Sequence, residues 1–148
     1  MMNDTSAGGI IYGQPQNLVP VDARLAGHPV RLTLARTENQ RAYGLMFRAE
    51  MPADEGMLFC YSLPQQMIFW MKNTILPLDL ILFDDRLRIS EVIRGMKPGI
   101  GIPEAQLPRY TAAAPAQYAL EMASGTADTW NLHPGDQLEI PLPLLNAD

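Results

Sequence analysis

The residues best suited to chemistry lie mainly between positions 41 and 79, where polar side chains interrupt apolar segments. Arginine, lysine and asparagine can donate hydrogen bonds to a ligand, tryptophan can stack on it, and acidic residues can orient the basic groups. The candidate ligand-binding residues are Arg41, Arg48, Trp70, Lys72, Asn73, Asp79 and Glu121. Small-ligand sites typically combine apolar walls with a few convergent polar groups. These residues therefore predict a binding module for a small polar or anionic ligand, sugar-like or peptide.

The acidic residues allow a second hypothesis, a hydrolase. Asp79 and Glu121 could act as paired carboxylates if their carboxyl groups stood about 5–9 Å apart across a cleft. Lys72 could keep one of them ionised while burial raised the pKa of the other. A third hypothesis is structural, because the same acids together with Arg41, Arg48 and Lys72 could form a buried network that fixes strand register. The chain would then be a structural or partner-docking domain with no small-molecule site.

Several other classes of site lack their sequence motifs. Gly99 and Gly101 are not followed by the third glycine and helix of a dinucleotide-binding motif, and no phosphate-binding loop or Gly-x-Ser-x-Gly elbow is present. His28 and His133 are far apart in the chain, and the single cysteine, Cys60, lies in an apolar stretch. We therefore expect no metal site, no internal disulfide and no cofactor.

The composition indicates one folded domain. The chain has 148 residues, of which 47% are hydrophobic and 18% charged, so it can bury a core and is not a disordered chain. Eleven basic and sixteen acidic residues give a net charge of −5, which argues against a nucleic-acid partner. No apolar run approaches the roughly 20 residues that a membrane-spanning helix needs. We expect a flexible lead-in over residues 1–17 and a single domain over residues 18–148.

Alternating apolar residues and turn signals predict the elements that must position these side chains. Thr37 and Gln40 have the spacing of a capping box at the start of a short helix. A second short helix is expected over residues 124–131 with Ser124 as its cap. Strands are predicted at 18–25, 30–35, 56–61, 67–71, 78–83, 87–94, 116–122 and 137–141. This pattern favours a mainly-β, single-domain antiparallel sandwich or barrel of about seven to eight short strands with one or two short helices.

Four short motifs connect the chain to a known family. They are Gly-Leu-Met-Phe-Arg at 44–48, Gly-Met-Leu-Phe at 56–59, Phe-Trp-Met-Lys-Asn-Thr at 69–74 and Pro-Leu-Asp at 77–79. Together they resemble the signature of the DUF192 family, also called UPF0127, of uncharacterised and often exported bacterial proteins. The resemblance extends from about residue 19 to residue 140 and implies a mostly-β, sandwich-like fold. It implies no established activity, and Gln40 stands where many members carry an acid, which weakens any argument for a catalytic acid beside Arg41.

The resemblance also bears on location. Many members of the family carry leader peptides or lipoprotein anchors, which implies the bacterial envelope. Residues 1–9 of this chain have neither the basic nor the apolar region of a signal peptide. We therefore expect the envelope or periplasm if a leader has been removed, and the cytoplasm otherwise.

Overall fold

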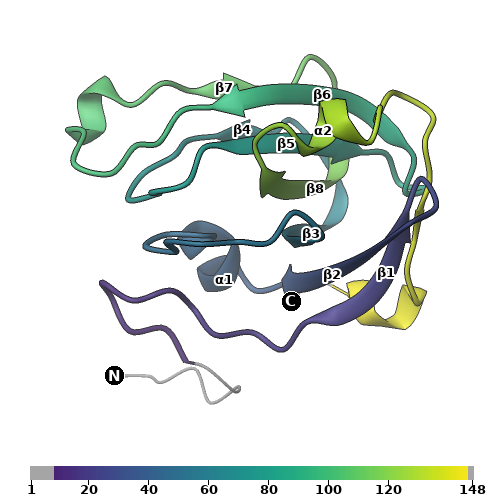
Figure 1. Ribbon diagram of the computed structural model, residues 1–148, viewed down its shortest axis with the longest axis horizontal. Coiled ribbons are helices and arrows are strands. Elements are labelled where there is room, and N and C mark those ends of the chain that lie inside the picture. The colour runs from purple at the N-terminus through teal and green to yellow at the C-terminus, as the bar shows by residue number, and fades with distance from the viewer. Residues whose placement is uncertain (1–8, 147–148) are drawn as a thin grey trace.

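A curled sheet of seven strands forms the body of the protein, which we describe from a computed structural model over residues 9–146 (Figure 1). The strand order is β6-β5-β8-β3-β2-β1-β9, and β4 and β7 form a separate two-stranded sheet. The strands are β1 (Val21–Leu25), β2 (His28–Ala35), β3 (Glu55–Gln65), β4 (Ile68–Phe69), β5 (Leu78–Phe83), β6 (Ile89–Met96), β7 (Tyr110–Thr111), β8 (Ala116–Ala123) and β9 (Leu138–Glu139). The helices are α1 (Glu38–Tyr43), α2 (Thr126–Thr129) and the 3₁₀ turns Glu104–Gln106 and Leu142–Leu145.

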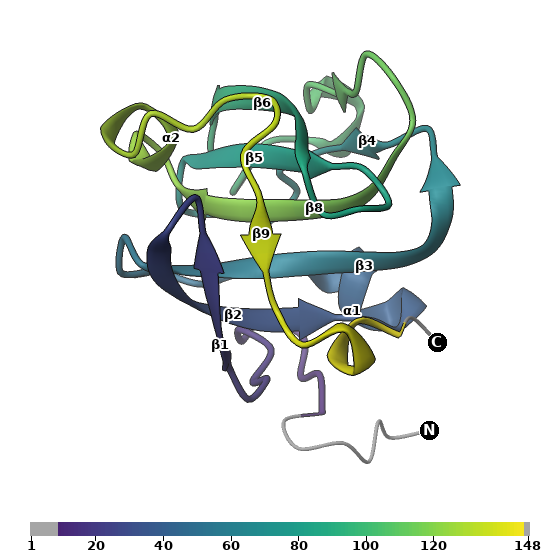
Figure 2. The same cartoon turned by 90° about the vertical axis from the view of Figure 1, so that its right-hand side faces the viewer.

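The sheet is curled into a half-barrel, so that the strands at its two ends lie close to each other. β9 pairs with β1 at one end, and Arg88, just before β6, bridges to Gln137, just before β9. Figure 2 shows β9 running across the open side of the curl. The prediction of a mainly-β, single-domain fold with short helices is therefore confirmed. One strand pair departs from the predicted antiparallel arrangement, since β2 and β3 run parallel. Helix α1 lies between these two strands in the sequence, and this connection carries the chain back to the end of the sheet at which β2 begins.

Both faces of the central strands are buried, which gives the protein two hydrophobic clusters. Strand β5 is buried at all six positions, as expected of a nearly continuous apolar run. Ile81 and Phe83 point into the curl, where they pack with residues of β1, β2, β3 and β8. Leu80 and Leu82 point to the outer face, which is covered by residues that follow α1 and residues around β4 and β7. The candidate functional site lies on this outer face.

The two helix caps differ from each other in how well the sequence predicted them. Thr37 caps α1 as expected: its hydroxyl accepts the Gln40 N–H at 3.1 Å, and the Gln40 side chain accepts the Thr37 N–H at 3.1 Å. The prediction that Ser124 caps the second helix is wrong. The N-cap residue of α2 is Gly125, and the carboxylate that accepts its first N–H groups belongs to Asp79, 46 residues earlier in the chain.

The predicted lead-in falls partly outside the structure, since residues 1–8 are not among the described residues. Residues 9–17 form no helix or strand, yet they are tied to α1 and the glycine after it. The Tyr43 hydroxyl donates to the Gln14 carbonyl at 2.6 Å, and the Gln16 amide donates to the Gly44 carbonyl at 2.8 Å. Within residues 9–146, no helix has the length and hydropathy needed to cross a bilayer.

Gly99 holds the loop after β6 against the segment that carries Trp70. Its N–H donates to the Thr74 carbonyl at 3.0 Å, and a Cβ built on it would lie 2.1 Å from the Met71 carbonyl oxygen. We expect Gly99→Ala to lower the free energy of unfolding by about 3 kcal/mol in chemical denaturation, because backbone must move to make room. Gly101→Ala is the control: it meets no atom within 4 Å but has a φ of +76°, so it should cost only about 1–2 kcal/mol. Equal costs at the two positions would contradict this steric explanation.

Candidate functional site

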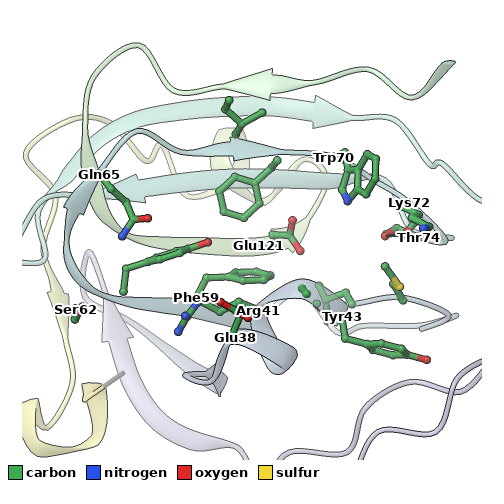
Figure 3. A pocket seen from close by; sticks show the side chains of 17 residues that line it. Glu38, Arg41, Tyr43, Phe59, Ser62, Gln65, Trp70, Lys72, Thr74 and Glu121 are labelled. Carbon is green, nitrogen blue, oxygen red and sulfur yellow. Dashed lines mark hydrogen bonds between the residues drawn. The ribbon is translucent and has the colours of Figure 1, made fainter. Parts of the chain in front are cut away.

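A pocket of about 460 Å³ lies over the outer face of β3 and β8, between α1 and the chain around β4 (Figure 3). Five aromatic side chains line it, together with the carboxyl groups of Glu38 and Glu121. The aromatic residues that line it are Tyr43, Phe59, Tyr61, Phe69 and Trp70. The volume falls within the range of small-ligand sites, about 300–1,000 Å³.

Strand alternation explains why these side chains meet. On β3, Phe59 and Tyr61 are two residues apart and therefore share a face. On β8, Ala119 and Glu121 share the corresponding face, and the register pairs Phe59 with Ala119. Ala119 is small, and the Phe59 ring meets Phe69 edge to face with the centroids 5.4 Å apart. The pocket is thus built from two neighbouring strands and covered by the segment around β4.

Glu121 is the unusual residue of the pocket. It is only 4% exposed, yet among the described residues its carboxyl group makes no hydrogen bond and no ion pair. Burial alone raises the pKa of Glu121 to about 8. At neutral pH the group is therefore mainly a neutral carboxylic acid, which can both donate and accept a hydrogen bond.

Arg41 and Lys72 also line the pocket, but both are engaged by other protein groups. The Arg41 guanidinium donates to the carbonyls of Arg36 and Cys60, the latter at 3.0 Å, and lies 4.8 Å from the centre of the Tyr61 ring. Lys72 forms an exposed ion pair with Glu104 at 2.9 Å and lies over Trp70. Of the seven predicted site residues, the structure brings Arg41, Trp70, Lys72 and Glu121 to one pocket.

Arg48 and Asn73 do not line this pocket. Arg48 pairs with Glu55 at 2.7 Å beside a smaller cavity of about 230 Å³. Asn73 is a turn residue with a φ of +54°, and its carbonyl accepts the Phe47 N–H at 2.9 Å. Its side-chain amide donates to the Tyr12 hydroxyl at 3.0 Å. Both residues are therefore engaged by protein groups outside the pocket lining.

Asp79 lies on the other face of the sheet. β5 pairs with β8 so that Leu80 is opposite Glu121 and Asp79 is opposite Met122, and successive residues of a strand point to opposite faces. The Asp79 carboxylate accepts the N–H groups of Gly95, Gly125 and Ala127, each at 3.0 Å. Asp79 and Glu121 therefore do not face each other across a cleft, and the paired carboxylates that the hydrolase hypothesis requires are not formed.

The sequence analysis misses most of the aromatic wall. It gives Tyr43, Phe59 and Tyr61 no role in the site, since an aromatic residue in an apolar segment is most often core. The alternation of Phe59 and Tyr61 was available in the sequence. What was not available is the register that places this face of β3 beside Glu121 on β8, which are some 60 residues apart in the chain.

The half-barrel with a βαβ crossover and an aromatic pocket on its outer face defines a small β domain. The chain belongs to the DUF192 family, described as an uncharacterised ACR, whose profile matches residues 21–140.

Two solved structures are similar to this chain. One is a protein from Sinorhizobium meliloti 1021 described as a candidate transcription regulator, with 32% identity and a TM-score of 0.73 over 83% of this chain and 96% of its own. The other is a protein of unknown function from Novosphingobium aromaticivorans DSM 12444, with 32% identity and a TM-score of 0.72 over 95% of this chain and 91% of its own. No protein with a curated description matches significantly.

Proposed function

We propose that this protein is a binding module for a small polar ligand, sugar-like or peptide, in the pocket over β3 and β8. The observation that carries the proposal is the Glu121 carboxyl group, which is buried in the pocket with no partner among the described residues. The Glu121 oxygens are not sealed in the core: among the described residues, the fully buried side-chain oxygen without a hydrogen bond is Gln16 Oε1. They face the pocket, where a ligand can hydrogen-bond to them.

The charges around the pocket favour a ligand that is not an anion. Arg41 is held by two carbonyls and Lys72 by Glu104, so neither cation is free to bind a carboxylate or phosphate without giving up a partner. Glu38 adds a second acid to the lining. The aromatic side chains offer flat apolar surfaces of the kind that stack on sugar rings or peptide groups.

Binding is favoured over hydrolysis and over nucleic-acid recognition. The Asp79–Glu121 pair that the hydrolase hypothesis requires is not formed, because Asp79 lies on the face of the sheet opposite to Glu121. The similar Sinorhizobium meliloti protein is described as a candidate transcription regulator, but the net charge of −5 of this chain does not favour contact with phosphates.

The proposal is tested by NMR titration with neutral sugars, dipeptides and small organic anions at millimolar concentration. The chain has two tryptophans, and their indole N–H signals serve as reporter and control. Trp70 lines the pocket, whereas Trp130 packs on the inner cluster and stacks on His28 with ring centroids 4.4 Å apart. At least one sugar or dipeptide should shift the Trp70 signal and leave the Trp130 signal in place. If no compound shifts Trp70 selectively, the pocket is not a ligand site.

Removing the stacking surface should weaken binding of whichever compound is found. We expect Trp70→Ala to raise its Kd about tenfold, which corresponds to the loss of one aromatic contact of about 1.4 kcal/mol. Trp130→Ala is the matched control and should leave the Kd unchanged. Both values are measured by isothermal titration calorimetry. An equal loss in the two variants would indicate a general effect on the fold instead of a contact in the pocket.

A further inference from the structure

The Glu121 carboxyl group, which has no partner among the described residues, also indicates which chemical group of the ligand reaches it. We propose that the group bound against Glu121 is a protonated amine, so that the ligand is an amino sugar or carries a peptide amino group. This inference rests on the proposed function, since it names the ligand class of the same pocket. An ammonium group donates to a carboxylate in a charge-assisted hydrogen bond, which is about twice as strong as a neutral one.

No cation within residues 9–146 takes this position. Among the described residues that line the pocket, the cations are Arg41 and Lys72. The Arg41 guanidinium is held by the carbonyls of Arg36 and Cys60 at the base of α1, and the Lys72 ammonium is held by Glu104. Within the part of the chain that the structure describes, Glu121 therefore has no counter-ion, and a ligand ammonium group would supply one.

The aromatic walls suit a cation as well. The faces of Tyr61 and Trp70 already attract cations, with Arg41 4.8 Å from the first ring centre and Arg109 4.3 Å from the second. Phe59 and Phe69 meet edge to face in the same pocket and have no cation over them among the described residues. A ring face within about 6 Å of an ammonium group contributes a cation–π attraction of roughly 0.5–2 kcal/mol when the pair is shielded from water.

Binding of an ammonium group must release a proton. In the empty pocket at neutral pH the Glu121 carboxyl group holds a proton, because burial raises its pKa to about 8. When R–NH₃⁺ binds, that proton leaves to solvent and the carboxylate pairs with the ammonium, so charge and atoms balance. The other titratable or charged groups that line the pocket are Glu38, Arg41 and Tyr43 from α1, Tyr61 from β3, and Lys72 after β4. Affinity for the amine should therefore rise from pH 6 to pH 8 as Glu121 ionises more easily.

Two matched ligand pairs test the amine directly. Glucosamine is compared with glucose, and alaninamide with N-acetylalaninamide, by titrating the Trp70 indole signal at pH 7. We expect at least one amine to bind about tenfold more tightly than its neutral partner, as a charge-assisted contact in a shielded site would give. The pair that shows the preference identifies the source, an amino sugar or a peptide amine. The calorimetric signal in two buffers of different ionisation enthalpy should show release of about one proton on binding.

Glu121→Gln supplies the matched variant, since it keeps the size and hydrogen-bonding capacity of the protonated acid. It should abolish both the preference for the amine over its neutral partner and the proton release on binding. An unchanged Trp130 signal confirms that the variant is folded. Equal affinities for amine and neutral partner in the wild-type protein would overturn the inference and leave the proposed function standing. Absence of any Trp70 shift would overturn both.

Discussion

As the pH rises from about 4.5 to about 8, the wild-type protein is expected to lose about 5 kcal/mol of stability relative to Glu121→Gln. The pKa of Glu121 rises from its ordinary value of 4.5 to about 8 on folding. Between these values the folded protein binds more protons than the unfolded chain, so stability falls by about 1.4 kcal/mol per pH unit. Below pH 4.5 the group is protonated in both states, and the two proteins should be nearly equally stable. Above pH 8 the difference should level off.

Urea denaturation at a series of pH values measures this difference, because other titrating groups contribute to both proteins and cancel. Glu139→Gln on β9 is the control: Glu139 is exposed, so its substitution should leave the pH profile within about 0.5 kcal/mol of the wild type. If the Glu121→Gln and wild-type profiles ran parallel from pH 4.5 to pH 8, the carboxyl group would be ionised in the folded protein. In that case a counter-ion would already be present in the empty pocket.

Local features of the fold could be predicted from the sequence because neighbouring residues determine them. The apolar run at Leu78–Phe83 is a strand buried on both faces, and the capping box of Thr37 and Gln40 starts α1. The parallel pairing of β2 and β3 could not be predicted in this way. It depends on where α1 returns the chain on the sheet, which is a contact between distant segments and leaves no mark in the periodicity of either strand.

The site was predictable in part for the same reason. Arg41, Trp70, Lys72 and Glu121 were singled out by residue type and do line one pocket. The roles of the two acids could not be separated, because each lies within an apolar strand and each must be satisfied or functional. Only the register of β5 against β8 decides that Asp79 and Glu121 point to opposite faces. A shift of one residue in that register would have placed them together.

Asp79→Ala is expected to destabilise the protein by about 3–5 kcal/mol, because a buried N–H group left without an acceptor costs about 1–3 kcal/mol and three of them lose theirs. The Asp79 carboxylate is 1% exposed and accepts N–H groups from Gly95 in β6 and from Gly125 and Ala127 around α2. Without it, three N–H groups from two separate segments lose their acceptor, and α2 loses its cap. Chemical denaturation measures the loss, and hydrogen exchange of these three amides should accelerate relative to the rest of the sheet.

Two further variants, Asp79→Asn and Asp22→Ala, set an intermediate and a lower limit for this loss of stability. Asn keeps one acceptor oxygen but turns an NH₂ group toward the N–H donors, so its cost should be intermediate, about 1–3 kcal/mol. Asp22 has a 94% exposed side chain that lies 4.0 Å from Arg31, so its removal should cost less than about 0.5 kcal/mol. While still folded, Asp79→Asn should bind the pocket ligand as the wild type does, because Asp79 lies on the opposite face. A loss of ligand affinity without a loss of stability would assign Asp79 to the site and reverse the division of roles between the two carboxyl groups.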